Sequence, residues 1–191
     1  DEVGYRVHHV ASFEDLEAIE PEVCKRLNAV ILEPLIQGAA GMQTWPAGML
    51  RDVRSWCEEN EVFLILDEVM TGFGRTGKMF ACEWEGVVPD FLCLAKGLTG
   101  GYLPLAATMT SETIFEAFLG SFEEQKTFYY GHSYCANPLG CAAALGSLRV
   151  FEEEQVLEKL PPKIDRFSRE LEKASERSPH FGAIRQVGLI A

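Results

Sequence analysis

Three ionisable side chains directly follow short apolar runs in the sequence. Glu33, Asp67 and Lys96 come after AVIL, VFLIL and FLCLA respectively. Runs of this length, rich in branched and aromatic residues, predict buried strands. Ligands of open α/β sheets bind outside the carboxyl ends of the strands. We therefore expect these side chains to gather at one edge of a sheet, next to a ligand.

Lys96 is the residue best suited to nucleophilic chemistry. It is followed by Gly97 and by the pair at residues 100–101, so its amine should lie in a glycine-rich turn at the sheet edge. Partial desolvation there would lower the lysine pKa and free the amine as a nucleophile. The alternative is a lysine that extends from a strand end into solvent. Taken alone, Lys96 favours that alternative.

Asp67 changes the balance between these two interpretations. A carboxylate at the end of a neighbouring strand can pair with a protonated pyridine nitrogen, and such a charge-assisted hydrogen bond contributes roughly 1.5–3 kcal/mol. A lysine that forms a Schiff base, together with an aspartate partner, is typical of pyridoxal 5'-phosphate chemistry. Asp67 could instead only cap a turn. Together, Asp67 and Lys96 predict a pyridoxal-phosphate site.

Strands and helices alternate along the chain, which predicts an α/β fold with a mostly parallel sheet. The apolar runs and helical repeats predict strands at 29–33, 62–66, 91–95 and 103–109, and helices at 12–20, from Pro46 to about 60, at 137–154 and at 162–176. The run at 186–191 predicts the start of a further strand. Because that run stops abruptly, we expect the chain to be a fragment of a longer enzyme.

Composition limits the partners and the compartment. The formal net charge is −12 over 191 residues, which argues against nucleic acid and anionic membranes as partners. No apolar run approaches the roughly 20 residues of a membrane span. Six cysteines without a C-x-x-C pair give no support for a metal site and suggest free thiols in a reducing compartment. We therefore expect a cytoplasmic protein.

Three sequence blocks resemble those of the class III pyridoxal-phosphate-dependent aminotransferases. Residues 67–77 read DEVMTGFGRTG, residues 94–101 read LAKGLTGG, and residues 131–139 read GHSYCANPL. The resemblance implies a fold type I transferase, with a mostly parallel sheet flanked by helices. Residues 1–156 would form part of the large cofactor-binding domain, and residues 157–191 would lead into the C-terminal small domain.

The resemblance also implies roles for individual residues. Lys96 would form the Schiff base with pyridoxal 5'-phosphate and later move a proton. Asp67 would hold the pyridine nitrogen, Val69 would pack on one face of the ring, and Gln37 would lie near the phenolic side of the ring. Arg75 would organise the glycine turn or bind a substrate carboxylate. Arginine can pair bidentately in either role, and the first role is the favoured one.

The third block implies a homodimer. In the family, the position of Ser133 is a threonine that reaches the cofactor phosphate of the neighbouring subunit, and a serine hydroxyl can also donate a hydrogen bond to phosphate. Gly131 and His132 would be backbone neighbours in that contact. The active sites would then be shared between two subunits.

Three further stretches, at 80–83, 89–94 and 104–110, are similar to the biotin-pathway branch of the family. That branch uses a small keto acid and an amino donor. Ala39 replaces the glutamate common in members that use ornithine or γ-aminobutyrate, which supports the assignment, whereas His132 departs from the pattern of the branch. The alternatives are another class III transaminase acting on ω-amino acids or amines, and a non-catalytic α/β module that kept the fold.

Overall fold

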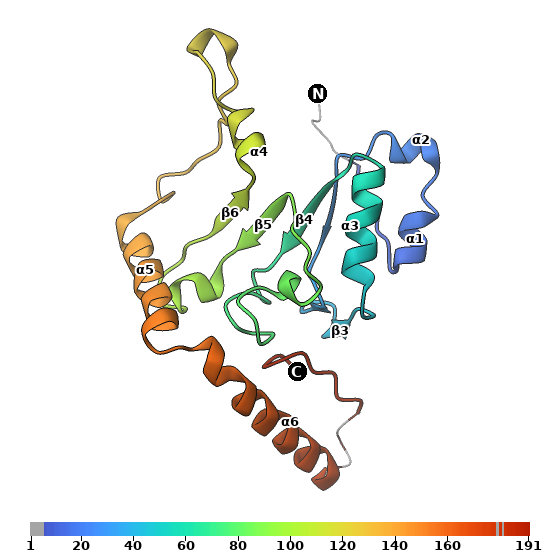
Figure 1. The fold of residues 1–191 in the computed structure, drawn as a ribbon, viewed down its shortest axis with the longest axis vertical. Coiled ribbons are helices and arrows are strands. Elements are labelled where there is room, and N and C mark those ends of the chain that lie inside the picture. The colour runs from blue at the N-terminus through green and yellow to red at the C-terminus, as the bar shows by residue number, and fades with distance from the viewer. Residues whose placement is uncertain (1–5, 179, 181) are drawn as a thin grey trace.

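A computed structural model describes residues 6–178, 180 and 182–191, and residues 1–5 of the expected large-domain segment lie outside that description. Its centre is a four-stranded sheet with the order β1-β4-β5-β6, drawn in Figure 1. The strands are β1 (Ala29–Leu32), β4 (Phe63–Asp67), β5 (Phe91–Leu94) and β6 (Ala107–Thr110). The first three are parallel and β6 is antiparallel to β5. The predicted α/β fold with a mostly parallel sheet is confirmed.

Helices begin where the sequence offers a cap or a proline. α1 (Phe13–Glu17) is capped by the hydroxyl of Ser12, and α2 (Pro21–Cys24) begins at a proline. α5 (Pro138–Glu153) is capped by the side chain of Asn137, and α6 (Leu160–Arg177) follows after a short 3-10 turn. α1, α5 and α6 lie close to their predicted ranges, because side-chain caps and proline near the first helical position are local signals. The short helix α2 was not predicted.

α3 (Met49–Glu59) begins three residues later than the predicted start at Pro46. Its cap is not local in sequence. The carboxylate of Glu85 accepts hydrogen bonds from the backbone N–H groups of Gly48 (2.9 Å) and Arg51 (3.1 Å). Gly48 itself adopts a left-handed conformation, with φ 90°. A carboxylate from a distant segment therefore satisfies the free N–H groups at this helix end.

One face of the sheet carries the hydrophobic core. Side chains alternate between faces along a strand, so Leu64 and Leu66 of β4 point to the side that α3 covers with Leu50, Val53 and Cys57, all of them almost fully buried. A second cluster joins β5 to α5 through Leu94, Leu98, Phe73 and Ala144. Both α3 and α5 therefore pack against the same face.

The other face of the sheet is more open within the described residues. Ile31 is 64% exposed and Phe63 is 47% exposed. The rings of Phe63 and Phe91 contact edge to face on this side, with centroids 5.7 Å apart. Asp67 belongs to this open face, since it lies an even number of residues from Phe63 along β4.

An arm projects from the sheet between β6 and α5 (Figure 1). It contains α4 (Glu112–Glu116) and the 3-10 turn η3 (Phe122–Glu124), and it carries a group of exposed aromatic side chains: Phe115, Phe118, Phe122, Phe128, Tyr129, Tyr130 and Tyr134. Within the described residues, these rings form an apolar surface on one projection.

The C-terminal segment differs from its prediction. Residues 186–191 do not form an extended strand. Val187 and Ile190 pair in an isolated bridge around Gly188, and the N–H of Leu189 donates to the carbonyl of Arg75 (2.8 Å). The turn is possible because Gly188 adopts φ 61° against the backbone of residues 75–76. The predicted strand at this end is therefore wrong in this chain.

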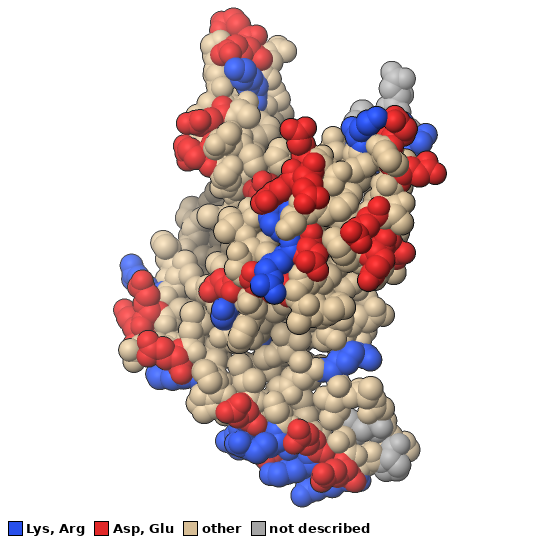
Figure 2. Space-filling view, turned by 45° about the vertical axis from the view of Figure 1, so that its right-hand side comes forward, with Lys and Arg blue, Asp and Glu red and all other residues tan. Residues whose placement is uncertain are grey.

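Charged side chains of both signs are spread over the face of the molecule drawn in Figure 2, its middle included. Figure 2 shows acidic and basic groups interspersed along α6 at the lower end of the molecule, and mainly acidic groups on the arm. In the ranges that the structure describes, no helix is both long and apolar enough to cross a membrane.

Candidate active site

The ends of β4 and β5 bring Asp67 and Lys96 to the same edge of the sheet. The two strands are parallel, and Asp67 lies beside Cys93 in their register. Lys96 follows Cys93 by three residues and opens the 3-10 helix η2 (Lys96–Thr99). Glu33 follows β1 at that edge, because β1 is also parallel to β4. The three ionisable groups singled out in the sequence thus leave the sheet at one edge.

Lys96 has an unusual backbone conformation. Its φ is 44°, in the left-handed region that lysine rarely adopts, and such conformations cluster at functional sites. The side chain is exposed, so the described chain does not provide the partial desolvation expected from the sequence. No carboxylate of the described residues pairs with its amine. The amine is therefore free to react with a bound carbonyl compound.

Two neighbours hold the turn that carries Lys96. The ring of Phe73 lies so close to Gly97 that an added Cβ would stand 2.8 Å from the Phe73 Cβ. On the other side, the Ser147 hydroxyl of α5 donates to the Gly97 carbonyl at 3.4 Å. Glycine is therefore required next to Lys96 by close packing against a ring and not by backbone torsion.

Asp67 uses one carboxylate oxygen locally. Its Oδ1 accepts a hydrogen bond from the backbone N–H of Val69 (3.0 Å), which closes a tight turn directly after β4. Within the described residues, its Oδ2 has no hydrogen-bond partner. Turn capping and ligand binding, the two alternatives for Asp67, are thus compatible, because they use different oxygens.

Cys93 is the neighbour of Asp67 across the sheet. Burial, followed by the adjacent Asp67 carboxylate, raises the pKa of the Cys93 thiol, whereas a hydrogen bond with Thr108 opposes the rise. Cys93 and Thr108 are partners in the β5–β6 register. Asp67, Cys93 and Thr108 therefore form a row across the open face of the sheet.

Glu33 has a structural role in this chain. Its carboxylate accepts the N–H of Gly38 (3.0 Å), and its carbonyl accepts the indole N–H of Trp45 (2.9 Å). These bonds hold a short hairpin of β2 (Ile36–Gln37) and β3 (Gln43–Thr44) against the sheet edge. The Met70 side chain packs onto Gly38, so the loop after β4 touches the loop that carries Gln37. Gln37 and Val69 are both half-buried there.

Gly131, His132 and Ser133 lie apart from this edge in sequence and in contacts. All three are exposed, and they connect the arm to α5. The hydrogen bonds of His132 are local: its N–H donates to the Cys135 thiol (3.2 Å), and its Nδ1 accepts the N–H of Tyr134 (3.1 Å). No hydrogen bond of the described chain joins these residues to Asp67 or Lys96.

Glu68 was missed by the sequence interpretation. It is fully buried, and its carboxylate accepts three hydrogen bonds, from the Thr71 hydroxyl and from the N–H groups of Ala81 and Cys82. The available signal was its position: a carboxylate next to a surface aspartate must point to the opposite, core-facing side of the strand end.

The chemistry of this edge fits pyridoxal 5'-phosphate. An aldehyde needs an accessible amine, and Lys96 offers one. A pyridinium N–H needs a free carboxylate oxygen, and Asp67 Oδ2 has no partner among the residues described. Half-buried Val69 and Gln37 come from the two loops that border the edge.

Comparison with known proteins agrees with this site. The family model for class III aminotransferases (Aminotransferase class-III) matches residues 5–191, so the chain belongs to the class III aminotransferase family, whose members use pyridoxal 5'-phosphate. It is 57% identical over 164 residues to a protein of Nitratidesulfovibrio vulgaris named adenosylmethionine-8-amino-7-oxononanoate aminotransferase, covering 86% of this chain and 30% of that protein.

Solved structures are similar over most of the chain. The crystal structure of adenosylmethionine-8-amino-7-oxononanoate aminotransferase from Methanocaldococcus jannaschii aligns with a TM-score of 0.79 and 52% identity, over 84% of this chain and 37% of that one. The taurine:2-oxoglutarate aminotransferase of Bifidobacterium kashiwanohense, solved with PLP and glutamate, aligns with a TM-score of 0.75 and 34% identity, over 85% and 35%. The chain thus spans about a third of the length of these relatives.

Proposed function

We propose that the protein containing this chain is a pyridoxal-phosphate-dependent aminotransferase that converts 8-amino-7-oxononanoate to 7,8-diaminononanoate in biotin biosynthesis. The observation that carries the proposal is the placement of Asp67 and Lys96 at the ends of adjacent parallel strands. The names of relatives at 57% and 52% identity support this keto acid as the substrate.

The residues at this edge of the sheet would have different roles in the reaction. Bound pyridoxal 5'-phosphate supplies an electron sink that stabilises negative charge at the carbon next to the transferred amine. Asp67 would keep the ring nitrogen protonated through its free oxygen. The amine of Lys96 would hold the aldehyde carbon and later carry a proton between substrate and cofactor. Val69 would pack on the ring, and Gln37 would lie near its phenolic oxygen.

We also propose a cytoplasmic homodimer with shared active sites. The exposed aromatic side chains of the arm form an apolar surface that a second copy could cover, and Ser133, flanked by Gly131 and His132, lies exposed where that arm meets α5. A serine hydroxyl can donate a hydrogen bond to phosphate, so Ser133 would reach the phosphate of the partner's cofactor. In this proposal, residues 1–156 belong to the large domain and residues 157–191 lead into the small one.

Two other functions remain as alternatives. Another class III transaminase, acting on an ω-amino acid or an amine, would use the same edge of the sheet; the similarity to the taurine:2-oxoglutarate enzyme favours it only weakly, at 34% identity. A non-catalytic module is disfavoured because the left-handed Lys96, with φ 44°, keeps a strained geometry that a structural lysine does not need.

The cofactor assignment is tested by covalent trapping in the full-length protein. Borohydride should fix pyridoxal 5'-phosphate on the peptide that contains Lys96, and Lys96→Ala should abolish transamination while the fold survives. Lys78 and Lys126 are the controls, because the first bonds to the Glu83 carbonyl and the second pairs with Glu124. Labelling of either control lysine in place of Lys96 would reject the assignment.

The substrate is tested by complementation. The full-length gene should restore growth without biotin in a strain that lacks this aminotransferase. If soluble protein is made and growth does not return, the transaminase alternative is favoured. A direct assay with adenosylmethionine and with lysine as amino donors would then identify the donor.

A further inference from the structure

Every polar group of Glu68, in its backbone and its side chain, makes a hydrogen bond within the described chain. Its N–H donates to the Cys93 carbonyl (3.0 Å), which extends the β4–β5 ladder by one residue, and its carbonyl accepts the N–H of Gly72 (3.0 Å). The carboxylate reaches further. Oε2 accepts the Thr71 hydroxyl (3.0 Å) and the N–H of Ala81 (2.7 Å), and Oε1 accepts the N–H of Cys82 (2.8 Å).

This pattern joins two segments that are separated by an irregular loop. Residues 68–80 contain no regular element, and the 3-10 helix η1 (Ala81–Trp84) follows them. The Glu68 carboxylate bonds to the first two N–H groups of η1 and so closes the base of this loop. The approach is tight, since a Cβ on Gly72 would stand 2.9 Å from the Glu68 carbonyl. The loop therefore has little freedom at the point where it leaves β4.

The residues on either side of Glu68 are the two proposed to touch the cofactor ring. Asp67 and Val69 are half-buried, whereas Glu68 points into the core and is 0% exposed. Any rotation of the Glu68 backbone would turn both neighbours, because consecutive residues share their peptide planes. A buried carboxylate with three donors is costly to disturb, since each lost bond leaves a buried group unsatisfied.

We propose that Glu68 is a positioning residue for this site, whose carboxylate, bonded to Thr71 and to the start of η1, fixes the direction in which Asp67 and Val69 meet the cofactor ring. The inference rests on the proposed function, because it requires a ring at this edge. It assigns no contact between Glu68 and the cofactor: Glu68 acts only through its two neighbours.

Two threonines in the same loop provide a matched test in the full-length protein. Thr71→Val removes one donor to Glu68 and keeps the side-chain shape. Thr76→Val makes the same change at a site that is also buried, at 2% exposure, and whose hydroxyl has no partner among the described residues. Glu68→Gln is the stronger variant, because its NH₂ group must face a backbone N–H of Ala81 or Cys82 in either orientation.

The measurements are the dissociation constant for pyridoxal 5'-phosphate, the pH titration of the visible absorption of the bound cofactor, and the melting temperature without cofactor. Thr71→Val should raise the dissociation constant about tenfold, the equivalent of roughly one hydrogen bond to a charged group, and should shift the midpoint of the absorption titration. Thr76→Val should change neither. Glu68→Gln should have a larger effect than Thr71→Val if it folds.

The outcomes separate this inference from the proposed function. If Thr71→Val lowers the melting temperature but leaves the dissociation constant and the absorption titration like those of Thr76→Val, Glu68 is only structural and the inference is rejected. If the unaltered protein binds no cofactor and shows no visible absorption, the proposed function itself has failed. Cofactor binding by the unaltered protein with a selective effect of Thr71→Val supports both.

Discussion

The ring of Phe73 lies directly against Gly97, the residue that follows Lys96. A Cβ added at Gly97 would be 2.8 Å from the Phe73 Cβ and 3.0 Å from its Cδ2. Phe73 is itself held by edge-to-face contacts with Phe80 and Phe151. Phe73, in the loop after β4, thus limits the position of the turn after β5. Because Asp67 precedes that loop and Lys96 lies in that turn, the positions of the two residues are coupled.

Gly97→Ala should therefore lower both stability and cofactor affinity. Either Phe73 or the turn must move, and inserting a methyl group into a packed site costs about 1–3 kcal/mol. The melting temperature and the retention of cofactor on dialysis measure the two effects. Gly146→Ala in α5 is the control, because nothing lies within 4 Å of its Cβ position, and alanine there should stabilise the helix by roughly 0.5–1 kcal/mol. Equal behaviour of the two variants would contradict the packing argument.

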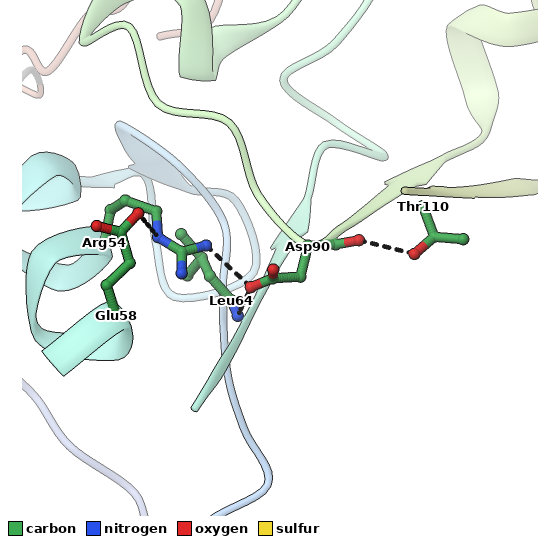
Figure 3. A network of polar contacts seen from close by, with 5 residues as sticks. All are labelled: Arg54, Glu58, Leu64, Asp90 and Thr110. Atoms are coloured by element: carbon green, nitrogen blue, oxygen red, sulfur yellow. Dashed lines mark hydrogen bonds and ion pairs between the residues drawn. The ribbon is translucent and has the colours of Figure 1, made fainter. Parts of the chain in front are cut away.

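Removing the Asp90 carboxylate should destabilise the fold without reaching the active site. Figure 3 shows Asp90 joining α3 to the sheet: its Oδ2 accepts Arg54 Nη1 (2.9 Å) and the N–H of Leu64 (2.7 Å), while its carbonyl accepts the Thr110 hydroxyl (2.9 Å). Arg54 also pairs with Glu58 at 3.0 Å, but the Glu58 side chain is 66% exposed. Asp90→Ala would leave Arg54, with 16% of its side chain exposed, without its better-buried partner.

We expect Asp90→Ala to cost about 2 kcal/mol in the free energy of unfolding, below the roughly 3–5 kcal/mol of a fully buried broken pair, since both partners keep some solvent. Denaturant titration measures it. Lys173→Ala is the control: it breaks an ion pair on α6 whose partners are more than half exposed, so its cost should stay under about 1 kcal/mol. Equal costs for the two variants would show that the Asp90 network contributes no more than a surface pair.

The buried thiols should make the fold sensitive to alkali. Burial is the main cause that raises the pKa of Cys57 to about 11, and burial followed by the Glu68 carboxylate raises the pKa of Cys82 to about 12. In the unfolded chain these thiols have their ordinary pKa of 9.0 and lose their protons there, whereas the folded chain keeps the protons to higher pH. Stability from this source is thus fully present below about pH 9 and falls as the pH rises towards 11 and 12.

Thermal melting between pH 7 and pH 11 checks this expectation, with Cys57→Ala and Cys82→Ala each flattening the alkaline decline. A thiol reagent at neutral pH should modify exposed Cys135 first and leave Cys57 and Cys82 unmodified until the protein unfolds. Early labelling of Cys57 or Cys82 would show that the core around β4 opens readily.

The aromatic arm should control subunit association. Phe122 is 84% exposed and Tyr129 is 76% exposed, and aromatic anchors carry much of the binding free energy of interfaces. Phe122→Ser and Tyr129→Ser together should raise the dimer dissociation constant at least about tenfold, the equivalent of 1.4 kcal/mol. Analytical ultracentrifugation over a dilution series measures the constant. Val88→Ser, an equally exposed apolar position outside the arm, should have no effect, and a dimer that tolerates the double change must use another surface.

The sequence by itself determined the three parallel strands of the main sheet and the residues at their ends, whereas β6 begins four residues later than expected and β2 and β3 were not predicted. Asp67 and Lys96 were identified because a buried strand is a short, continuous apolar run, and the first charged residue after it marks the sheet edge. The start of α5 was likewise readable, since Asn137 and Pro138 are local helix signals. The family blocks added the cofactor and the roles expected of these residues.

Only the tertiary structure decided what surrounds those strand ends. It showed Glu68 bonded to η1, Phe73 against Gly97, Glu85 capping α3 from a distant segment, and a turn where a strand was expected near Gly188. It also placed α3 and α5 on one face of the sheet and left Lys96 exposed. Local sequence patterns could not predict these features, because each depends on contacts between residues far apart in sequence. Such contacts form only when the chain has packed.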